Sequence, residues 1–157
     1  MTVHEVTPAI DPSTLLAGAQ FVDAFRIEID DRALDARHAA ERMMARQPPW
    51  AEALLTLRNL LVAPFGLKTS GASRTAPREM IGIFPILSET PDRLVAGFND
   101  KHLDFRVVVD IANSGTVRNV TATTLALTHN WLGRTYLAII LPFHRLIVRT
   151  LLRQVAT

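Results

Sequence analysis

Hydrophobic and polar residues alternate along four neighbouring segments in the second half of the chain, a pattern that is typical of β-strands. The segments are 80–87, 93–98, 102–111 and 116–127, and short turn-forming stretches separate them. An antiparallel meander that places Phe98 opposite Leu103 keeps the large apolar residues on one face. Pro85 lies in the first segment, so we expect that strand to lie at an edge or to contain a bulge.

Residues 21–29 (FVDAFRIEI) form an earlier segment with the same alternation, which predicts a strand with Phe21, Phe25 and Ile27 on one face. Two helices are expected after it. The first is capped by Asp30 or Asp31 and ends near residue 46, and the second covers 50–62.

The remaining N-terminal and central segments contain few strong signals. A short helix is expected after Asp11, with Pro12 at its first position. Residues 1–11 are expected to be an extension and 66–79 a loop, because small and turn-forming residues break any period there.

The C-terminal segment 134–154 has apolar residues at helical spacing, and Asn130 suits the N-cap position before it. Its longest uncharged run around the apolar centre is nine residues, 135–143. A membrane span needs about 20 largely apolar residues, so we expect an amphipathic helix packed on the sheet and no transmembrane segment. Pro142 should kink this helix.

Charge is distributed unevenly along the chain. All 15 acidic residues lie at or before Asp110, whereas residues 111–157 contain five arginines and no acidic residue. Two explanations are open: the C-terminal helix docks on the acidic remainder of the domain, or it meets an anionic partner. No basic motif with interleaved aromatic residues is present, so we expect no nucleic-acid partner.

Length and composition predict a single α+β domain over residues 1–157. The chain has no cysteine, which excludes disulfides and thiolate chemistry. The N-terminus has no basic-then-apolar signal pattern, so we expect a cytoplasmic protein. No glycine-rich phosphate loop or paired-histidine zinc motif occurs, and we expect no cofactor and no metal.

Two polar residues occupy the centres of apolar helix faces. His144 lies in the apolar stripe of the C-terminal helix, and Arg58 lies in that of the helix 50–62. His144 is either a neutral imidazole bonded to a backbone carbonyl or hydroxyl, or a ligand contact or general base. Arg58 is either paired with an acid or extended to the surface, or it anchors an anion inside a pocket.

His102, Asp104 and Arg106 alternate along one strand and share its solvent-facing side. A histidine and an aspartate two positions apart could bind a metal, but no third ligand is visible. We therefore expect a surface ion pair between neighbouring strands.

Three sequence strings resemble a known family. WAEALLTLRNLLV (50–62), HLDFRV (102–107) and HNWLGRTYLAIILPFHRLIV (129–148) are similar to bacterial domain-of-unknown-function family 2867, and the resemblance covers roughly 15–155. The element order resembles the helix-grip fold of the Bet v 1-like, or START-like (SRPBCC), superfamily. That resemblance implies a strand, two helices, a four-stranded antiparallel meander, and a long C-terminal helix packed on the curved sheet.

Helix-grip proteins often bind lipids, sterols or polyketides, so the resemblance implies a small hydrophobic ligand between the sheet and the C-terminal helix. The expected ligand-binding residues are His144, Arg58, Tyr136, Phe105, Leu137 and Ile140. Two alternatives remain: an enzyme on the same scaffold with His144 as acid or base, and a module that docks on a protein or membrane through the helix arginines. The sequence assigns neither a catalytic residue nor an oligomeric state.

Overall fold

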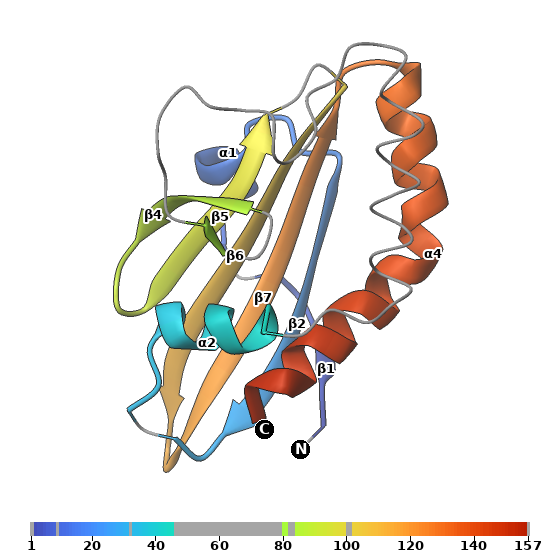
Figure 1. The fold of residues 1–157 in the computed structure, drawn as a ribbon. Coiled ribbons are helices and arrows are strands. Elements are labelled where there is room, and N and C mark those ends of the chain that lie inside the picture. The colour runs from blue at the N-terminus through green and yellow to red at the C-terminus, as the bar shows by residue number, and fades with distance from the viewer. Residues whose placement is uncertain are drawn as a thin grey trace.

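The computed structural model describes residues 2–8, 10–31, 33–45, 80–81, 84–99 and 102–156. In this part of the chain, an antiparallel sheet has the strand order β1-β2-β7-β6-β5-β4-β3 (Figure 1). The strands are β1 (His4–Val6), β2 (Phe21–Ile29), β3 (Met80–Ile81), β4 (Phe84–Glu89), β5 (Arg93–Asn99), β6 (Leu103–Ser114) and β7 (Val117–Thr128). The two-residue β3 only extends the edge of the sheet at β4. The helices are α1 (Pro12–Leu15), α2 (Ala36–Met43) and α4 (Trp131–Arg153), and α4 continues into the 3-10 turn η2 (Gln154–Ala156).

The antiparallel strands are confirmed, but the single strand predicted over 80–87 was wrong, because this segment contains β3 and the start of β4, which pair with each other. β2 has the bounds expected from its alternation, and the meander keeps its apolar residues on one face. The predicted register of the β5–β6 hairpin was wrong, because Phe98 pairs with Phe105 and not with Leu103. This error of two residues leaves every side chain on its predicted face, since side chains alternate with a period of two. A register shift between Ile86 and Ser88 follows Pro85, as the proline predicted.

The N-terminal residues are not a plain extension. His4–Val6 form β1, which pairs with β2, and a salt bridge joins Glu5 to Arg145 of α4. The short helix after Asp11 is confirmed as α1. The alternation of a three-residue strand is too short to distinguish from chance, which explains why β1 was missed.

The predicted cap of the first long helix was misplaced. Asp35, and neither Asp30 nor Asp31, is the N-cap of α2, and its side chain accepts a 2.8 Å hydrogen bond from the backbone N–H of His38. This bond favours the ionised carboxylate and so lowers the pKa of Asp35. The predicted helix 50–62 and loop 66–79 lie outside the described residues.

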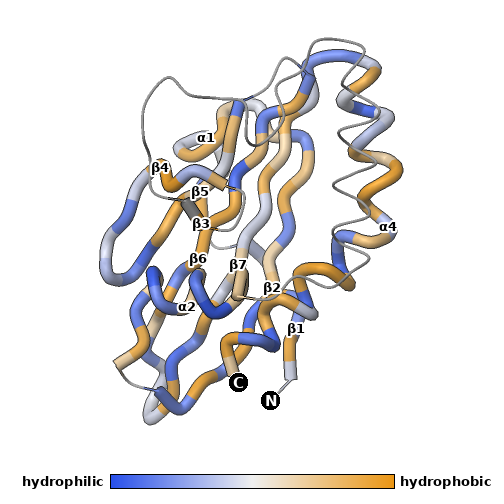
Figure 2. Tube along the Cα trace, in the orientation of Figure 1, coloured by the Kyte–Doolittle hydropathy of each residue, from blue (hydrophilic) through white to orange (hydrophobic). Residues whose placement is uncertain are grey.

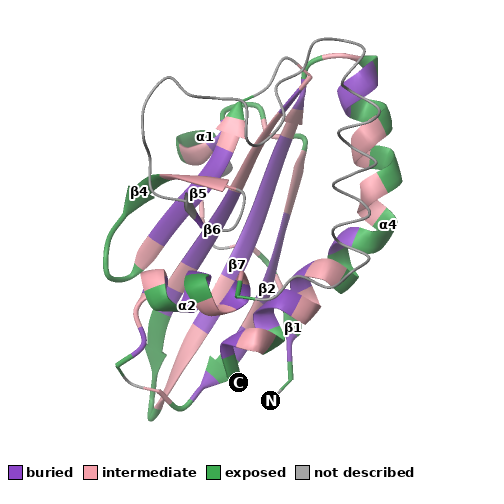
Figure 3. Cartoon of the chain, in the orientation of Figure 1, coloured by how far each residue is buried: buried purple, intermediate pink, exposed green. Residues whose placement is uncertain are grey.

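The two faces of the sheet are covered differently. The inner face packs against α2 and α4 and forms the main core, in which Phe25, Ile27 and Leu152 are fully buried. The outer face has a smaller core in which Leu16, just after α1, packs with Val108 of β6 and other apolar residues. Figure 3 shows the buried centre of the sheet between these layers.

Asn130 is the N-cap of α4, as expected, and its side-chain oxygen accepts a 3.0 Å hydrogen bond from the backbone N–H of Gly133. Gly133 lies so close to the sheet that a Cβ atom there would stand 1.9 Å from the carbonyl oxygen of His102. Pro142 lies inside the helix, which bends part-way along its length (Figure 1). The start of α4 is therefore fixed by backbone contact, and its lower part turns back onto the sheet.

By length and composition, α4 and its extension (Trp131–Ala156, 26 residues) could cross a membrane. Only 22% of the most apolar part of this helix is buried inside the protein. The nine-residue limit drawn from the sequence was too strict, because a span tolerates a few charges near its ends. That α4 does not span a membrane remains a prediction.

Candidate functional site

A buried histidine–aspartate pair links α4 to β2. Nε2 of His144 lies 3.0 Å from Oδ2 and 3.1 Å from Oδ1 of Asp23, and each side chain is only 10% exposed. Phe21 packs edge-on against the imidazole, with 5.3 Å between ring centroids and 86° between the ring planes. The expectation of a carbonyl or hydroxyl partner for His144 was wrong, because its partner is a carboxylate.

Asp23 is the functional candidate that the sequence interpretation missed. Strand alternation places it on the inner face between Phe21 and Phe25, and it pairs across the sheet with the buried Thr124. A carboxylate at an inward position of an otherwise apolar strand face was itself the signal, since a buried charge needs a partner.

The pairing determines what the imidazole can do. An ionised carboxylate only accepts hydrogen bonds, so the contact with an ionised Asp23 requires the form of His144 that carries a proton on Nε2. Nδ1 has no hydrogen-bond partner in the described part of the chain, and it is not among the fully enclosed unpaired atoms there. Nδ1 can accept a hydrogen bond in the neutral ring and donate one in the charged ring.

α4 has buried residues in its first turn, at Leu132 and Gly133, and again from His144 onward, but none between them (Figure 3). After His144, Val148, Leu151 and Leu152 are buried against the sheet. Before His144, Leu137 and Ile140 precede it by seven and four residues and so lie on the same helix face, yet they are only half-buried.

Several large aromatic residues of the inner face are also incompletely buried. Phe21, Phe98 and Phe105, near the end where α4 begins, are half-buried, although the smaller Leu103, Ala126 and Thr128 at the same end are buried. Phe84, Phe98 and Phe105 stack on one another, with 5.2–6.0 Å between ring centroids. We call the half-buried residues of both faces the upper interface; they are Phe21, Phe84, Phe98, Phe105, Tyr136, Leu137, Ile140 and Leu141.

Five of the six predicted ligand-binding residues are among the described residues. His144 is buried, and the other four are half-buried residues of the upper interface as named above: Phe105, Tyr136, Leu137 and Ile140. That these residues bind a ligand remains a prediction. Arg58 lies outside the described residues.

A second histidine–aspartate pair lies on the outer face of the sheet. Nε2 of His129 is 3.0 Å from Oδ1 of Asp104, with side chains 39% and 15% exposed. This confirms the expected ion pair between neighbouring strands. Arg106 donates to the carbonyl oxygens of Phe98 and Phe105. Burial lowers the pKa of Arg106, and the charge of Asp104 offsets part of that effect.

The described residues contain no cluster of three or more His, Cys, Asp or Glu side chains that could hold a metal ion. Histidine–aspartate pairs with no third ligand are poor metal sites.

The family comparison covers most of the chain. Residues 15–151 match the model of DUF2867, described as proteins of unknown function. The chain belongs to this family. No curated protein and no solved structure matches it. Because DUF2867 carries no assigned activity, the function of this member has to be inferred from its own side chains.

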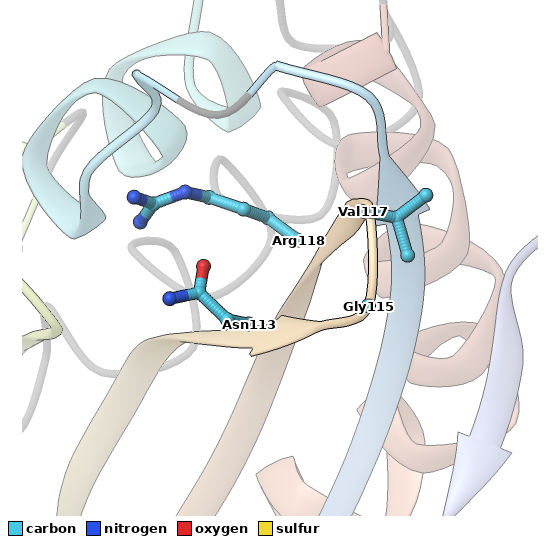
Figure 4. A pocket seen from close by; sticks show the side chains of 4 residues that line it. All are labelled: Asn113, Gly115, Val117 and Arg118. Atoms are coloured by element: carbon cyan, nitrogen blue, oxygen red, sulfur yellow. The ribbon is translucent and has the colours of Figure 1, made fainter.

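At the opposite end of this DUF2867 sheet, a pocket of about 250 Å³ lies at the β6–β7 turn. It is lined by Asn113, Gly115, Val117 and Arg118, and the Asn113 and Arg118 side chains extend to the same side of the hairpin (Figure 4). Nε of Arg118 is buried and has no hydrogen-bond partner in the described structure. This pocket contains none of the predicted ligand-binding residues.

Proposed function

We propose that this DUF2867 protein binds a small, largely apolar molecule at the upper interface, between the inner face of the sheet and the first half of α4. The incomplete burial of α4 between its first turn and His144 is the observation that carries the proposal. Apolar side chains on two facing elements stay half-buried, although the same two elements pack fully a few residues farther along. Incomplete burial of this kind leaves apolar surface for a ligand to cover.

The Asp23–His144 pair supports a polar contact at the base of this site. Binding sites for apolar molecules are lined mostly by hydrophobic and aromatic side chains, with a few polar groups that orient the ligand. Here Phe21 and the stacked phenylalanines supply the apolar lining, and Nδ1 of His144 supplies the polar contact. A hydroxyl group on the ligand suits Nδ1 in either protonation state, because it both donates and accepts.

We further propose that the fold is a helix-grip member of the Bet v 1-like superfamily. The antiparallel sheet with a long C-terminal helix across its inner face supports this assignment. The two expected helices between the first strand and the meander are represented by α2 alone in the described chain. The assignment agrees with a ligand site between sheet and helix.

An enzyme on the same site is the second candidate, and the orientation of His144 favours it. A carboxylate that fixes one imidazole nitrogen and leaves the other available is the arrangement of a general base. Asp23 has this relation to His144. The reacting group would lie against Nδ1, and Asp23 would act as a positioning residue.

Native mass spectrometry of the freshly purified protein, with extraction and identification of any adduct, tests the proposal. We expect a one-to-one complex with an apolar molecule. The matched variant His144→Gln should hold less of the same molecule if the protein only binds it. If His144 performs chemistry, the variant should instead hold a chemically different molecule, the unconverted substrate. A protein that carries no adduct and takes up no added long-chain fatty acid would contradict both candidates.

A further inference from the structure

The side of α4 that faces away from the sheet contains a second apolar surface. Ile139, Phe143 and Leu146 are 38%, 45% and 53% exposed, and their spacing of four and three residues places them on one helix face. We call these three residues the outer ridge. Trp131, at the start of the helix, is 62% exposed, and hydrophobic stretches run along α4 (Figure 2). Exposed apolar residues that gather on one helix commonly mark an interaction surface.

Two arginines of α4, Arg134 and Arg153, are exposed near its two ends, and neither makes an ion pair in the described structure. Only Arg153 lies beside the outer ridge: it follows Leu146 by seven residues and shares its helix face, whereas Arg134 precedes Phe143 by nine residues and lies on the other side. Arg145 is neutralised by Glu5, and Arg149 lies over the ring of Phe25. No acidic residue follows Asp110 in the sequence, so nothing on α4 itself offsets the remaining charge.

This combination of charge and exposed apolar surface argues against a second copy of the chain as the partner. Two copies meeting through the outer ridge would bring their arginines together with no acidic residue on either α4. An anionic partner with an apolar part would neutralise the positive charge of α4 and bury the outer ridge.

Transmembrane insertion of α4 fits the structure poorly. The opposite face of the helix is packed on the sheet through Val148, Leu151 and Leu152. Insertion would strip this face from the core and place His144 in hydrocarbon without Asp23, which is costly. A helix that lies in the plane of the membrane surface keeps both contacts.

We propose that α4 docks on the surface of an anionic phospholipid bilayer, with the outer ridge in the region between headgroups and acyl chains. Arg153 would contact lipid phosphates, and Trp131 would lie at headgroup level, where tryptophan is enriched. This surface lies on the side of α4 away from the upper interface. Docking on the bilayer therefore requires no ligand in the upper interface.

Vesicle flotation of the full chain tests this docking. The vesicles are made either of phosphatidylcholine alone or of phosphatidylcholine and phosphatidylglycerol in equal parts. We expect binding to the anionic vesicles only, weakened by added salt because the charge contacts are exposed. Arg153→Gln should weaken binding about fivefold, which corresponds to about 1 kcal/mol per arginine at the surface.

A double substitution in the outer ridge and a control outside it separate docking from loss of folding. Phe143→Ser together with Leu146→Ser should reduce vesicle binding at least tenfold. Leu87→Ser is the matched control, because Leu87 of β4 is a similarly exposed apolar residue (37%) away from α4. It should bind like the unchanged protein, and circular dichroism should report the same helix content in all variants.

Several outcomes would overturn the proposal. They are absence of binding at low salt, equal binding to both vesicle types, and binding that the double substitution leaves intact. Resistance of the bound protein to alkaline carbonate extraction would identify α4 as a membrane span instead. Concentration-dependent dimerisation that the double substitution abolishes, without vesicle binding, would identify a protein partner.

Discussion

Asp23→Ala should lower the free energy of unfolding by about 3–5 kcal/mol, which is a large part of the 5–15 kcal/mol typical of a domain. The substitution leaves the His144 imidazole buried with no partner for Nε2, and it opens a small void between β2 and α4. Urea denaturation followed by circular dichroism measures this loss. The double variant Asp23→Leu with His144→Leu should recover most of it, because replacing both partners leaves no unpaired polar group.

The chain contains its own control for this experiment. The Asp104–His129 pair has the same 3.0 Å separation, but its histidine is 39% exposed, against 10% for His144. Asp104 is itself mostly buried and its charge also acts on Arg106, so Asp104→Ala should cost about 1–2 kcal/mol, still less than Asp23→Ala. Equal losses for Asp23→Ala and Asp104→Ala would mean that burial does not distinguish the two pairs and would remove the special role of Asp23–His144.

Ile140→Trp should weaken the binding of an apolar ligand at least tenfold, a loss of about 1.4 kcal/mol. Ile140 lies in the upper interface, half-buried on the same helix face as His144. An indole ring there occupies the space that the proposed ligand needs. Titration with a dansyl-labelled fatty acid, followed by its fluorescence, measures the affinity.

Ile139→Trp is the matched control for this substitution. It makes the same change of volume one residue earlier, but Ile139 points outward on the outer ridge. We expect its affinity for the labelled fatty acid to stay within twofold of the unchanged protein. Loss of binding in both variants, or in neither, would contradict a site at the upper interface.

The sequence predicted those parts of the fold in which one residue period dominates. The alternation of β2 gave its bounds, and the helical spacing of α4 with Asn130 gave that helix and its cap. Local sequence patterns did not identify a helix N-cap where several nearby residues could each serve as the cap. Three aspartates, at 30, 31 and 35, precede α2, and only the structure identifies Asp35 as the cap. The β5–β6 register also depended on the length of the turn, which apolar alternation does not determine.

Only part of the candidate site was predicted, because the sequence shows which single residues are unusual but not which distant residues they contact. His144 was visible because one polar residue interrupts an apolar helix stripe. Its partner Asp23 lies more than a hundred residues earlier, and no local pattern connects the two. The outer ridge was missed because we assigned the apolar residues of α4 to a single face that packs on the sheet. In the structure, apolar residues on its far side, including Phe143 and Leu146, remain exposed.

Isotope-filtered NMR on the protein with a bound long-chain fatty acid, or with the molecule that co-purifies, tests the central claim most directly. The method detects short distances between ligand protons and individual side chains. We predict contacts from the ligand to Leu137, Ile140 and Phe105, and from its polar end to the His144 ring. Contacts confined to Ile139, Phe143 and Leu146, or no contact with any side chain of the upper interface, would contradict ligand binding between α4 and the sheet.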